Sequence, residues 1–215
     1  MIKAILFDLD GTLINTNRLI IETFQHVFRT HLSIEVPNEE LSKYFGEPLA
    51  YTMERYHPEN PEFLVKAYQE HNIKIHDQLA EIFEGVEDGI KGLKNYGLKV
   101  GIVTSKIRSV ANRGLKLFDL YGLMDVIITP EDTEKHKPDR EPILKACELL
   151  GVDPKEAMMV GDSHNDILSG KNAGCETCLV KYTGVPIEQV IKYNPDYLID
   201  SIVDIINIVK EKVGA

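Results

Sequence analysis

The chain has 215 residues, of which 43% are hydrophobic and 27% charged, a composition typical of a globular protein. Its formal net charge of −10 argues against a broad basic surface for nucleic acid or for an anionic membrane. We find no run near the roughly 20 apolar residues that cross a bilayer, and three cysteines cannot form a complete disulfide framework. These features predict a cytoplasmic protein without nucleic-acid or membrane partners.

The first predicted element is a strand at residues 2–7, which leads into the stretch FDLDGTL. Two carboxylates, Asp8 and Asp10, follow this apolar run directly, and Gly11 and Thr12 come next. Asp10-Gly11 by itself is typical of a turn. Two negative charges at the end of a buried strand therefore need an explanation from the rest of the chain.

Residues 15 to about 83 contain helical patterns and no convincing strand. Ile20, Phe24, Val27 and Phe28 form one apolar helical face, and Asn60-Pro61 is a typical helix start. A connection of about 70 residues is far longer than an ordinary crossover between strands. We therefore predict an inserted α-helical cap at residues 15–85 and a core domain made of residues 1–14 and 86–215.

The rest of the chain alternates between strands and helices. Apolar runs of strand length occur at residues 100–103, 126–128, 157–160 and 178–180, and such continuous runs are typical of strands buried on both faces. Ile143, Ala146, Cys147 and Leu150 have helical spacing between two of them. This alternation predicts an α/β fold with a mainly parallel sheet.

Polar residues follow four of the predicted strands. These are Asp8 and Asp10, Thr104 and Ser105, Lys137, and finally Asp162 and Asp166 in GDSHNDI. The carboxyl ends of parallel strands are where such sheets bind ligands. Carboxylates suit Mg²⁺, and a lysine with a hydroxyl suits phosphate oxygens. The combination predicts a site for a Mg²⁺-bound phosphoryl group.

Each of these residues also has an ordinary structural explanation. Thr104 or Ser105 alone could cap the next helix, and Lys137 before a proline could be a solvated loop residue. Asp162 and Asp166 lack the spacing and closing glutamate of a calcium loop. Their joint occurrence at four strand ends is what favours the functional interpretation.

The motifs FDLDGTL, IVTSK, Lys137 in KHKPD, and GDSHNDI resemble, in order and spacing, the four motifs of the haloacid dehalogenase-like (HAD) hydrolase superfamily. The resemblance extends over the whole chain and is greatest to the phosphoglycolate phosphatases and small bacterial pyrophosphatases. It implies a Rossmann-like core with an inserted α-helical cap. It also implies a phosphohydrolase for a small phosphorylated metabolite or pyrophosphate.

The resemblance implies a role for each motif residue. Asp8 would be the nucleophile that forms an aspartyl-phosphate, and Asp10 would be the general acid and then the general base. Mg²⁺ would be held by the Asp8 carboxylate, the Asp10 backbone carbonyl and Asp162, with Asp166 as an outer support. The side chains of Thr104 and Lys137 would bind the transferred phosphoryl oxygens. Backbone N–H groups around Leu9, Gly11 and Ser105 would help them.

The resemblance further implies that the cap opens and closes during turnover and selects the substrate. The stretch FGEPL (residues 45–49) resembles the specificity loop of the family, with Lys43 and Arg55 as candidate anion contacts. His164 and the Cys175/Cys178 pair stay without an assigned role, although buried free thiols explain the two cysteines better than a redox or zinc pair.

Two other functions share these core motifs. A phosphosugar mutase of the β-phosphoglucomutase type would have a histidine early in the first cap helix, and RLIIET (residues 18–23) contains none. A phospho-acceptor switch would need neither the acid Asp10 nor a large cap. The sequence therefore favours a hydrolase over both.

Overall fold

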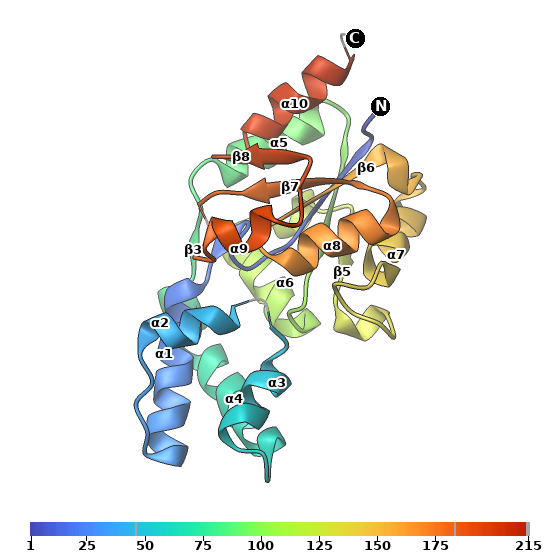
Figure 1. Ribbon diagram of the computed structural model, residues 1–215. Helices are drawn as coiled ribbons and strands as arrows, with labels where there is room; N and C mark the ends of the chain where they lie inside the picture. Colours follow the sequence, from blue (N-terminus) through green and yellow to red (C-terminus); the bar gives the residue numbers. More distant parts are fainter. Residues whose placement is uncertain (46, 183, 214–215) are drawn as a thin grey trace. The chain divides into compact units, whose positions relative to one another are not determined.

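A computed structural model gives the fold and describes residues 1–45, 47–182 and 184–213. The chain forms two compact units, the first from Met1–Ile14 with Ile82–Ala215 and the second from Asn15–Glu81 (Figure 1). We call them the sheet unit and the helical unit. The sheet unit includes Ile82 and the residues that follow it, and the N–H of Phe83 donates to the carbonyl of Leu13 at 3.2 Å within this unit.

The sheet unit is built on a six-stranded sheet in which every pairing between neighbouring strands is parallel. The strand order is β5-β4-β1-β6-β7-β8, so β1 is central. This arrangement confirms the predicted α/β fold. The strands are β1 (Ala4–Phe7), β4 (Lys99–Val103), β5 (Val126–Ile128), β6 (Ala157–Gly161), β7 (Glu176–Val180) and β8 (Tyr197–Ile199).

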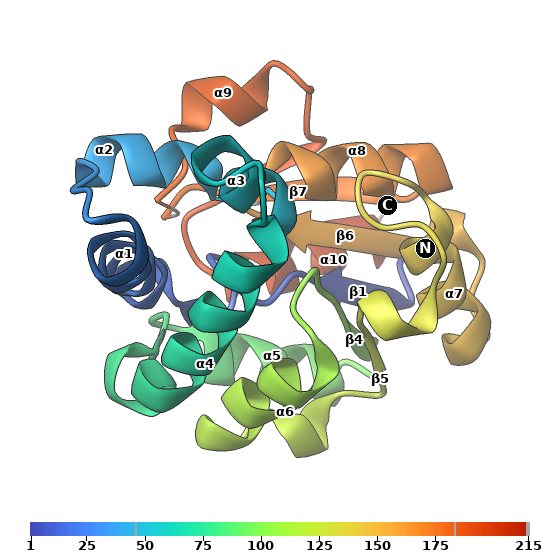
Figure 2. The same ribbon diagram turned by 90° about the horizontal axis from the view of Figure 1, so that it is seen from below.

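Helices cover the sheet on both faces (Figure 2). Ala4 and Leu6 of β1 pack with Ile143 and Ala146 of α7 in one apolar cluster. Because side chains alternate along a strand, Ile5 and Phe7 point to the opposite face. The helices of this unit are α5 (Val86–Asn95), α6 (Arg108–Leu117), α7 (Glu141–Leu150), α8 (His164–Ala173), α9 (Ile187–Ile191) and α10 (Asp204–Val213).

The helical unit has its own apolar core. Phe24 and Val27 of the first helix pack with Met53 and Leu64 from two later helices. The helices are α1 (Asn17–Val27), which continues as a π-helix (Phe28–Leu32), α2 (Asn38–Leu41), α3 (Leu49–Tyr56) and α4 (Pro61–Leu79). The Asn60 side chain caps α4 by accepting from the N–H of Phe63, with Pro61 in the first turn, as Asn60-Pro61 predicts.

Three short strands were not predicted. The strands β2 (Ile14–Asn15) and β3 (Glu81–Ile82) pair in a separate two-stranded sheet. They are too short to show an alternating pattern. The edge strand β8 is only three residues long, and one of its side chains, Leu198, is exposed, so it lacks the continuous apolar run of a buried strand. Among the described residues, no helix has the length and hydropathy of a membrane span.

Candidate active site

The site is assembled at the carboxyl ends of β1, β4 and β6, which are neighbours in the sheet. The N–H of Asp8 donates to the carbonyl of Val160 at 2.9 Å, and the N–H of Thr104 donates to that of Ile128 at 3.0 Å. The hydrogen bonds of the sheet thus continue one residue past the strand ends. Because β1 also pairs with β4, the first and second motifs, which are far apart in the chain, lie at one edge of the sheet.

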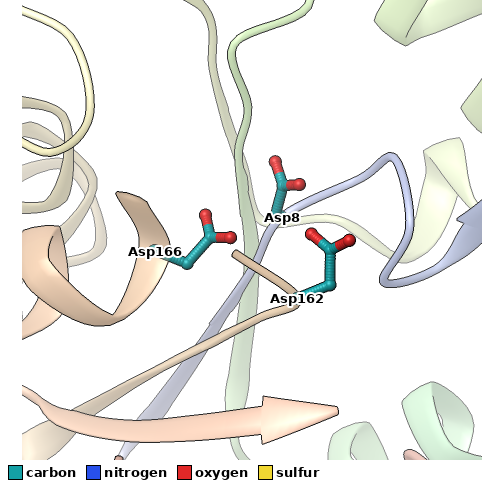
Figure 3. A group of neighbouring side chains, drawn as sticks. All are labelled: Asp8, Asp162 and Asp166. Carbon is teal, nitrogen blue, oxygen red and sulfur yellow. The ribbon is translucent and has the colours of Figure 1, made fainter. Parts of the chain in front are cut away.

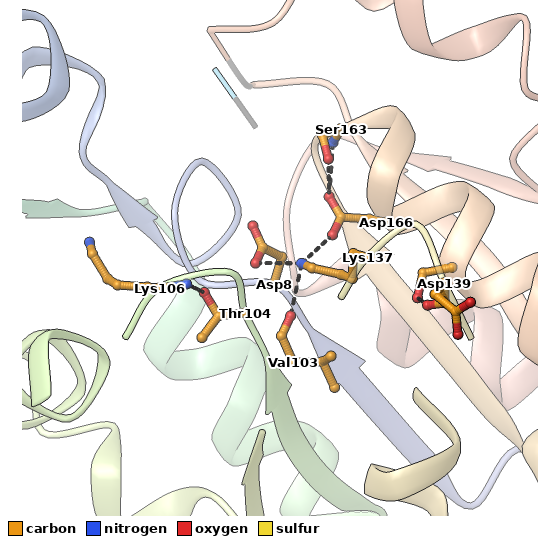
Figure 4. A network of polar contacts seen from close by, with 9 residues as sticks. Asp8, Val103, Thr104, Lys106, Lys137, Asp139, Ser163 and Asp166 are labelled. Atoms are coloured by element: carbon orange, nitrogen blue, oxygen red, sulfur yellow. Dashed lines mark hydrogen bonds and ion pairs between the residues drawn. The ribbon is translucent and has the colours of Figure 1, made fainter. Parts of the chain in front are cut away.

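Lys137 connects three of the strand ends (Figure 4). Its Nζ donates to Oδ1 of Asp8 at 2.8 Å, to Oδ1 of Asp166 at 2.6 Å and to the carbonyl of Val103 at 2.9 Å. Only 4% of its side chain is exposed. Three acceptors satisfy the three donors of a buried ammonium group, so Lys137 is not a solvated loop lysine.

The buried charges perturb one another. Burial lowers the pKa of Lys137, but Asp166 and Asp8 outweigh this effect and hold that pKa above its ordinary value. Burial also raises the pKa of Asp8 to about 7, and the neighbouring carboxylates of Asp166 and Asp10 act in the same direction against Lys137. One lysine therefore does not compensate the negative charge that gathers here.

The loop that carries Lys137 is anchored to α8. The hydroxyl of Ser169 donates to the carbonyl of Asp139 at 2.8 Å, and the side-chain amide of Asn172 donates to that of Pro138 at 3.0 Å. These two bonds hold the backbone at Pro138 and Asp139, the two residues that follow Lys137. A long side chain that starts from a held backbone can reach a defined position with less loss of conformational entropy.

Asp166 links the fourth motif to Lys137. Its Oδ2 accepts from the N–H and the hydroxyl of Ser163, at 3.0 and 2.7 Å, in a capping box that starts α8. Its Oδ1 accepts from Lys137. The carboxylate is fully buried. The same side chain thus starts a helix and orients the lysine.

Asp8, Asp162 and Asp166 offer carboxylate oxygens that all lie within 4.8 Å of one another (Figure 3). Hard oxygen donors at this separation suit Mg²⁺, and a cation among them would offset the negative charge that raises the pKa of Asp8. The donor set therefore fits the metal that the motifs imply. Asp166, which the sequence assigns to an outer support, also lies within 4.8 Å of the other two carboxylates.

Gly11 shapes the loop after β1. Its φ of +78° is in the left-handed region, and a Cβ at this position would lie 2.2 Å from Oδ2 of Asp162. Only glycine allows both this backbone and this approach. Its N–H donates to the carbonyl of Ile14 at 2.9 Å, so Gly11 contributes a conformation here and its own N–H is engaged within the loop. Leu9, beside it, has a fully buried side chain.

The segment after β4 brings in a lysine that the sequence analysis did not assign. The hydroxyl of Thr104 accepts from the N–H of Lys106 at 3.1 Å, and Ser105 between them is exposed. Nζ of Lys106 donates to Oδ1 of Asp10 at 2.6 Å. The lysine stands within the second motif, but spacing alone does not indicate which carboxylate it meets.

Two candidate anion contacts of the helical unit have partners there. Lys43 donates to Glu40 at 2.6 Å, and Arg55 holds Glu47 through two hydrogen bonds of 2.7 and 3.2 Å. Their charges are balanced locally, which weakens the prediction that they bind substrate. Position 46 of the FGEPL stretch lies outside the described residues.

His164 and the cysteines, which have no assigned role, have the following surroundings. His164 stacks on Tyr193 with ring centroids 5.6 Å apart. Cys175 and Cys178 are buried and free, as expected, and Cys147 is the third buried free thiol. Cys175 lies in the same apolar cluster as Cys147 of α7.

Comparison with known proteins shows the family of this chain. The family model of the haloacid dehalogenase-like hydrolases matches residues 5–180 of the sequence. A PpaX protein of Clostridium perfringens is 49% identical over 211 residues, which cover 98% of this chain and 99% of that protein. The pyrophosphatase PpaX of Halalkalibacterium halodurans is 44% identical over 211 residues, 98% of each chain.

Solved structures show the same fold. The crystal structure of a predicted phosphoglycolate phosphatase from Haemophilus somnus superimposes with a TM-score of 0.86 at 21% identity, covering 97% of this chain and 98% of that one. A haloacid dehalogenase-like hydrolase from Streptococcus pneumoniae has a TM-score of 0.88 at 22% identity, with the same coverage. At such identities the likeness concerns the fold alone.

Proposed function

The chain belongs to the haloacid dehalogenase-like hydrolase family, and from this premise we propose that it is a Mg²⁺-dependent phosphatase that hydrolyses inorganic pyrophosphate through a phosphorylated Asp8. One observation carries the proposal: Asp8, at the end of the central strand, is bound by the buried Lys137 and lies among two further carboxylates. This arrangement combines a nucleophile, a phosphate-binding cation and oxygen donors for a metal.

Asp8, Asp162 and Asp166 are the side chains that would hold Mg²⁺, and the backbone carbonyl of Asp10 would complete the set of oxygen donors. When bound, the ion supplies positive charge that offsets the phosphoryl oxygens and the clustered carboxylates. The carboxylate of Asp8 must be ionised to attack phosphorus, and the ammonium of Lys137 at 2.8 Å favours that form.

The reaction then takes place in two displacements on phosphorus. In the first, an oxygen of Asp8 forms a bond to phosphorus while the bond to the leaving phosphate breaks, and Asp10 gives its proton to the leaving oxygen. In the second, water attacks the aspartyl-phosphate, Asp10 takes the proton of that water, and the Asp8 carboxylate is released. Each cycle consumes one water and returns both aspartates to their starting states.

The phosphoryl oxygens would be bound by groups around Asp8. Lys137 contributes its ammonium, and the hydroxyl of Thr104 is oriented for donation because it accepts from the N–H of Lys106. Backbone N–H groups near Leu9 and Ser105 would complete the set. Donors that are fixed before the reaction stabilise the developing charge without a reorganisation cost.

The relatives of this chain favour pyrophosphate as the substrate. One that is named a pyrophosphatase is 44% identical and matches 98% of this chain. Phosphoglycolate is the alternative that the motifs alone leave open. A phosphosugar mutase shares the core residues, but the first cap helix lacks the early histidine that the mutase resemblance requires.

The test is a substrate panel at fixed Mg²⁺ with pyrophosphate, phosphoglycolate, glucose 1-phosphate, glucose 6-phosphate and p-nitrophenyl phosphate. We expect phosphate release with the highest kcat/KM on pyrophosphate, and loss of release when Mg²⁺ is chelated. A preference for phosphoglycolate would correct the substrate but keep the enzyme class. Interconversion of the two glucose phosphates, or no phosphate release from any compound, would overturn the proposal.

A further inference from the structure

We propose that Lys106 is the positioning residue of Asp10, the acid and base of the reaction; this inference rests on the proposed function. Its Nζ donates to Oδ1 of Asp10 at 2.6 Å, although the two residues are 96 positions apart in the sequence. The distance is that of a charge-assisted hydrogen bond. The contact joins the loop after β4 to the loop after β1.

The ion pair is better shielded than an ordinary surface pair. The side chain of Lys106 is 14% exposed and that of Asp10 is 26% exposed. Exposed pairs contribute little because water and salt screen them and both side chains must be ordered. Here the base of the lysine is held as well, since its N–H donates to the hydroxyl of Thr104. A lysine tethered at both ends can hold a carboxylate in one place.

The two aspartates of the first motif thus have different lysines. Lys137 binds Asp8 together with Asp166, whereas Lys106 binds Asp10. A nucleophile and a proton-transfer group two residues apart must keep distinct positions, because each acts on a different atom of the substrate. Two separate ammonium partners provide that distinction.

Proton transfer is sensitive to such positioning. A general acid must come within hydrogen-bond reach of the atom that it protonates, and small displacements lower the rate steeply. Without Lys106, Asp10 would lose the ammonium group that holds its carboxyl group in place. Turnover should then fall although the nucleophile stays intact.

A direct contact of Lys106 with the substrate anion is the competing explanation, and a double-mutant cycle separates the two. We would measure kcat and KM with pyrophosphate and Mg²⁺ for Lys106→Met, Asp10→Asn and the double variant, by single turnover where rates are low. Lys106→Arg tests rescue by a charged donor. Lys94→Met is the matched control, because it removes a lysine–aspartate pair (to Asp125, 2.6 Å) elsewhere in the same unit.

If Lys106 positions Asp10, Lys106→Met lowers kcat about 10-fold or more, a fraction of the ~10²-fold or larger loss of a missing general acid, with little change in KM. The loss disappears in the Asp10→Asn background, and Lys106→Arg recovers part of it. Lys94→Met keeps wild-type kinetics. A second readout is the ratio of kcat/KM for phenyl and p-nitrophenyl phosphate, which should fall in Lys106→Met because the more basic leaving group needs the acid more.

Three results would overturn the inference. They are wild-type kcat in Lys106→Met, an equal loss from Lys106→Met with and without Asp10, or an effect confined to KM. Thermal unfolding of each variant identifies losses that come from a damaged fold, and Lys106→Gln replaces Lys106→Met if the latter is unstable. Failure of the proposed function is distinct, because the wild-type chain would then release no phosphate.

Discussion

At the scale of single residues, the site depends on close contacts between charges. Lys137 faces two carboxylates, Asp8 and Asp166, and is itself almost entirely buried. A buried ion pair is seldom a net source of stability, because desolvation offsets the attraction. We therefore infer that this cluster of charges serves catalysis and does not stabilise the fold.

Replacement of the nucleophile separates these two roles. We expect Asp8→Asn to lower turnover by at least ~10³-fold, the scale seen when a nucleophile is removed. Its thermal midpoint in metal-free buffer at pH 8 should equal or exceed that of the wild type. One of three clustered carboxylates is gone, while Lys137 keeps Asp166 at 2.6 Å. Differential scanning calorimetry and a phosphate assay measure both, and a large fall in the midpoint would contradict this view.

Gly161, the last residue of β6, supports the fourth motif by its lack of a side chain. A Cβ there would lie 2.3 Å from Cβ and Cγ of Asp166. We expect Gly161→Ala to cost ~1–3 kcal/mol of stability, as overpacking does, and to lower kcat because Asp166 must shift away from Lys137. Gly122→Ala is the control, since a Cβ at Gly122 meets nothing within 4 Å. Equal denaturant midpoints for the two variants would refute the expectation.

At the scale of elements, the packing of α1 against α4 contains a stacked pair of imidazoles. The rings of His26 and His71 are parallel within 5°, with centroids 3.5 Å apart. Burial lowers the pKa of His71, and the charges of His26 and Lys74 lower it further. The contact thus favours a neutral imidazole at His71.

The pH dependence follows from that direction. Because the pKa of His71 is lower in the folded chain than the ordinary value of about 6.5, the unfolded chain binds more protons below that pH, and stability falls as the pH falls. We expect the thermal midpoint of the wild type to drop more between pH 7 and 5 than that of His71→Gln. His57→Gln, which keeps the stacked pair, should follow the wild type. Parallel curves for all three would contradict the prediction.

The observed strands show how well local sequence patterns predict the bounds of a strand. The run at residues 126–128 is a strand with those bounds, and four other runs differ from their strands by one or two residues at an end. β8 was missed, because its pairing with β7 and not its own sequence makes it a strand. The spacing of apolar residues indicates which segments are buried. An edge strand is only partly buried, so its spacing gives a weaker signal.

At the scale of the whole molecule, two segments that are far apart in the sequence place three carboxylates within 4.8 Å of one another in a chain of net charge −10. We expect chelation of divalent ions to abolish turnover and Mg²⁺ to restore it. Mg²⁺ should also raise the thermal midpoint, since an ion that binds only the folded chain stabilises it by ~2.7 kcal/mol at 100 times its Kd. Asp162→Asn should lose both effects, whereas Glu59→Gln, in the helical unit, should keep them. Full activity in chelator would rule out the metal.

The sequence by itself determined five of the six strands of the large sheet, and which polar residues follow these strands. These features are local: they depend on spacing within a few residues and on the rule that ligands gather at strand ends. It therefore predicted Asp8, Thr104, Lys137 and Asp162 as members of one site.

Only the tertiary structure decided which charges meet. That Lys137 binds Asp166 as well as Asp8, that Lys106 binds Asp10, and that Arg55 is held by Glu47 are contacts between residues whose spacing carries no signal. Such pairs depend on strand order and on how loops are anchored, because the packing of distant segments sets the distances at which charges interact.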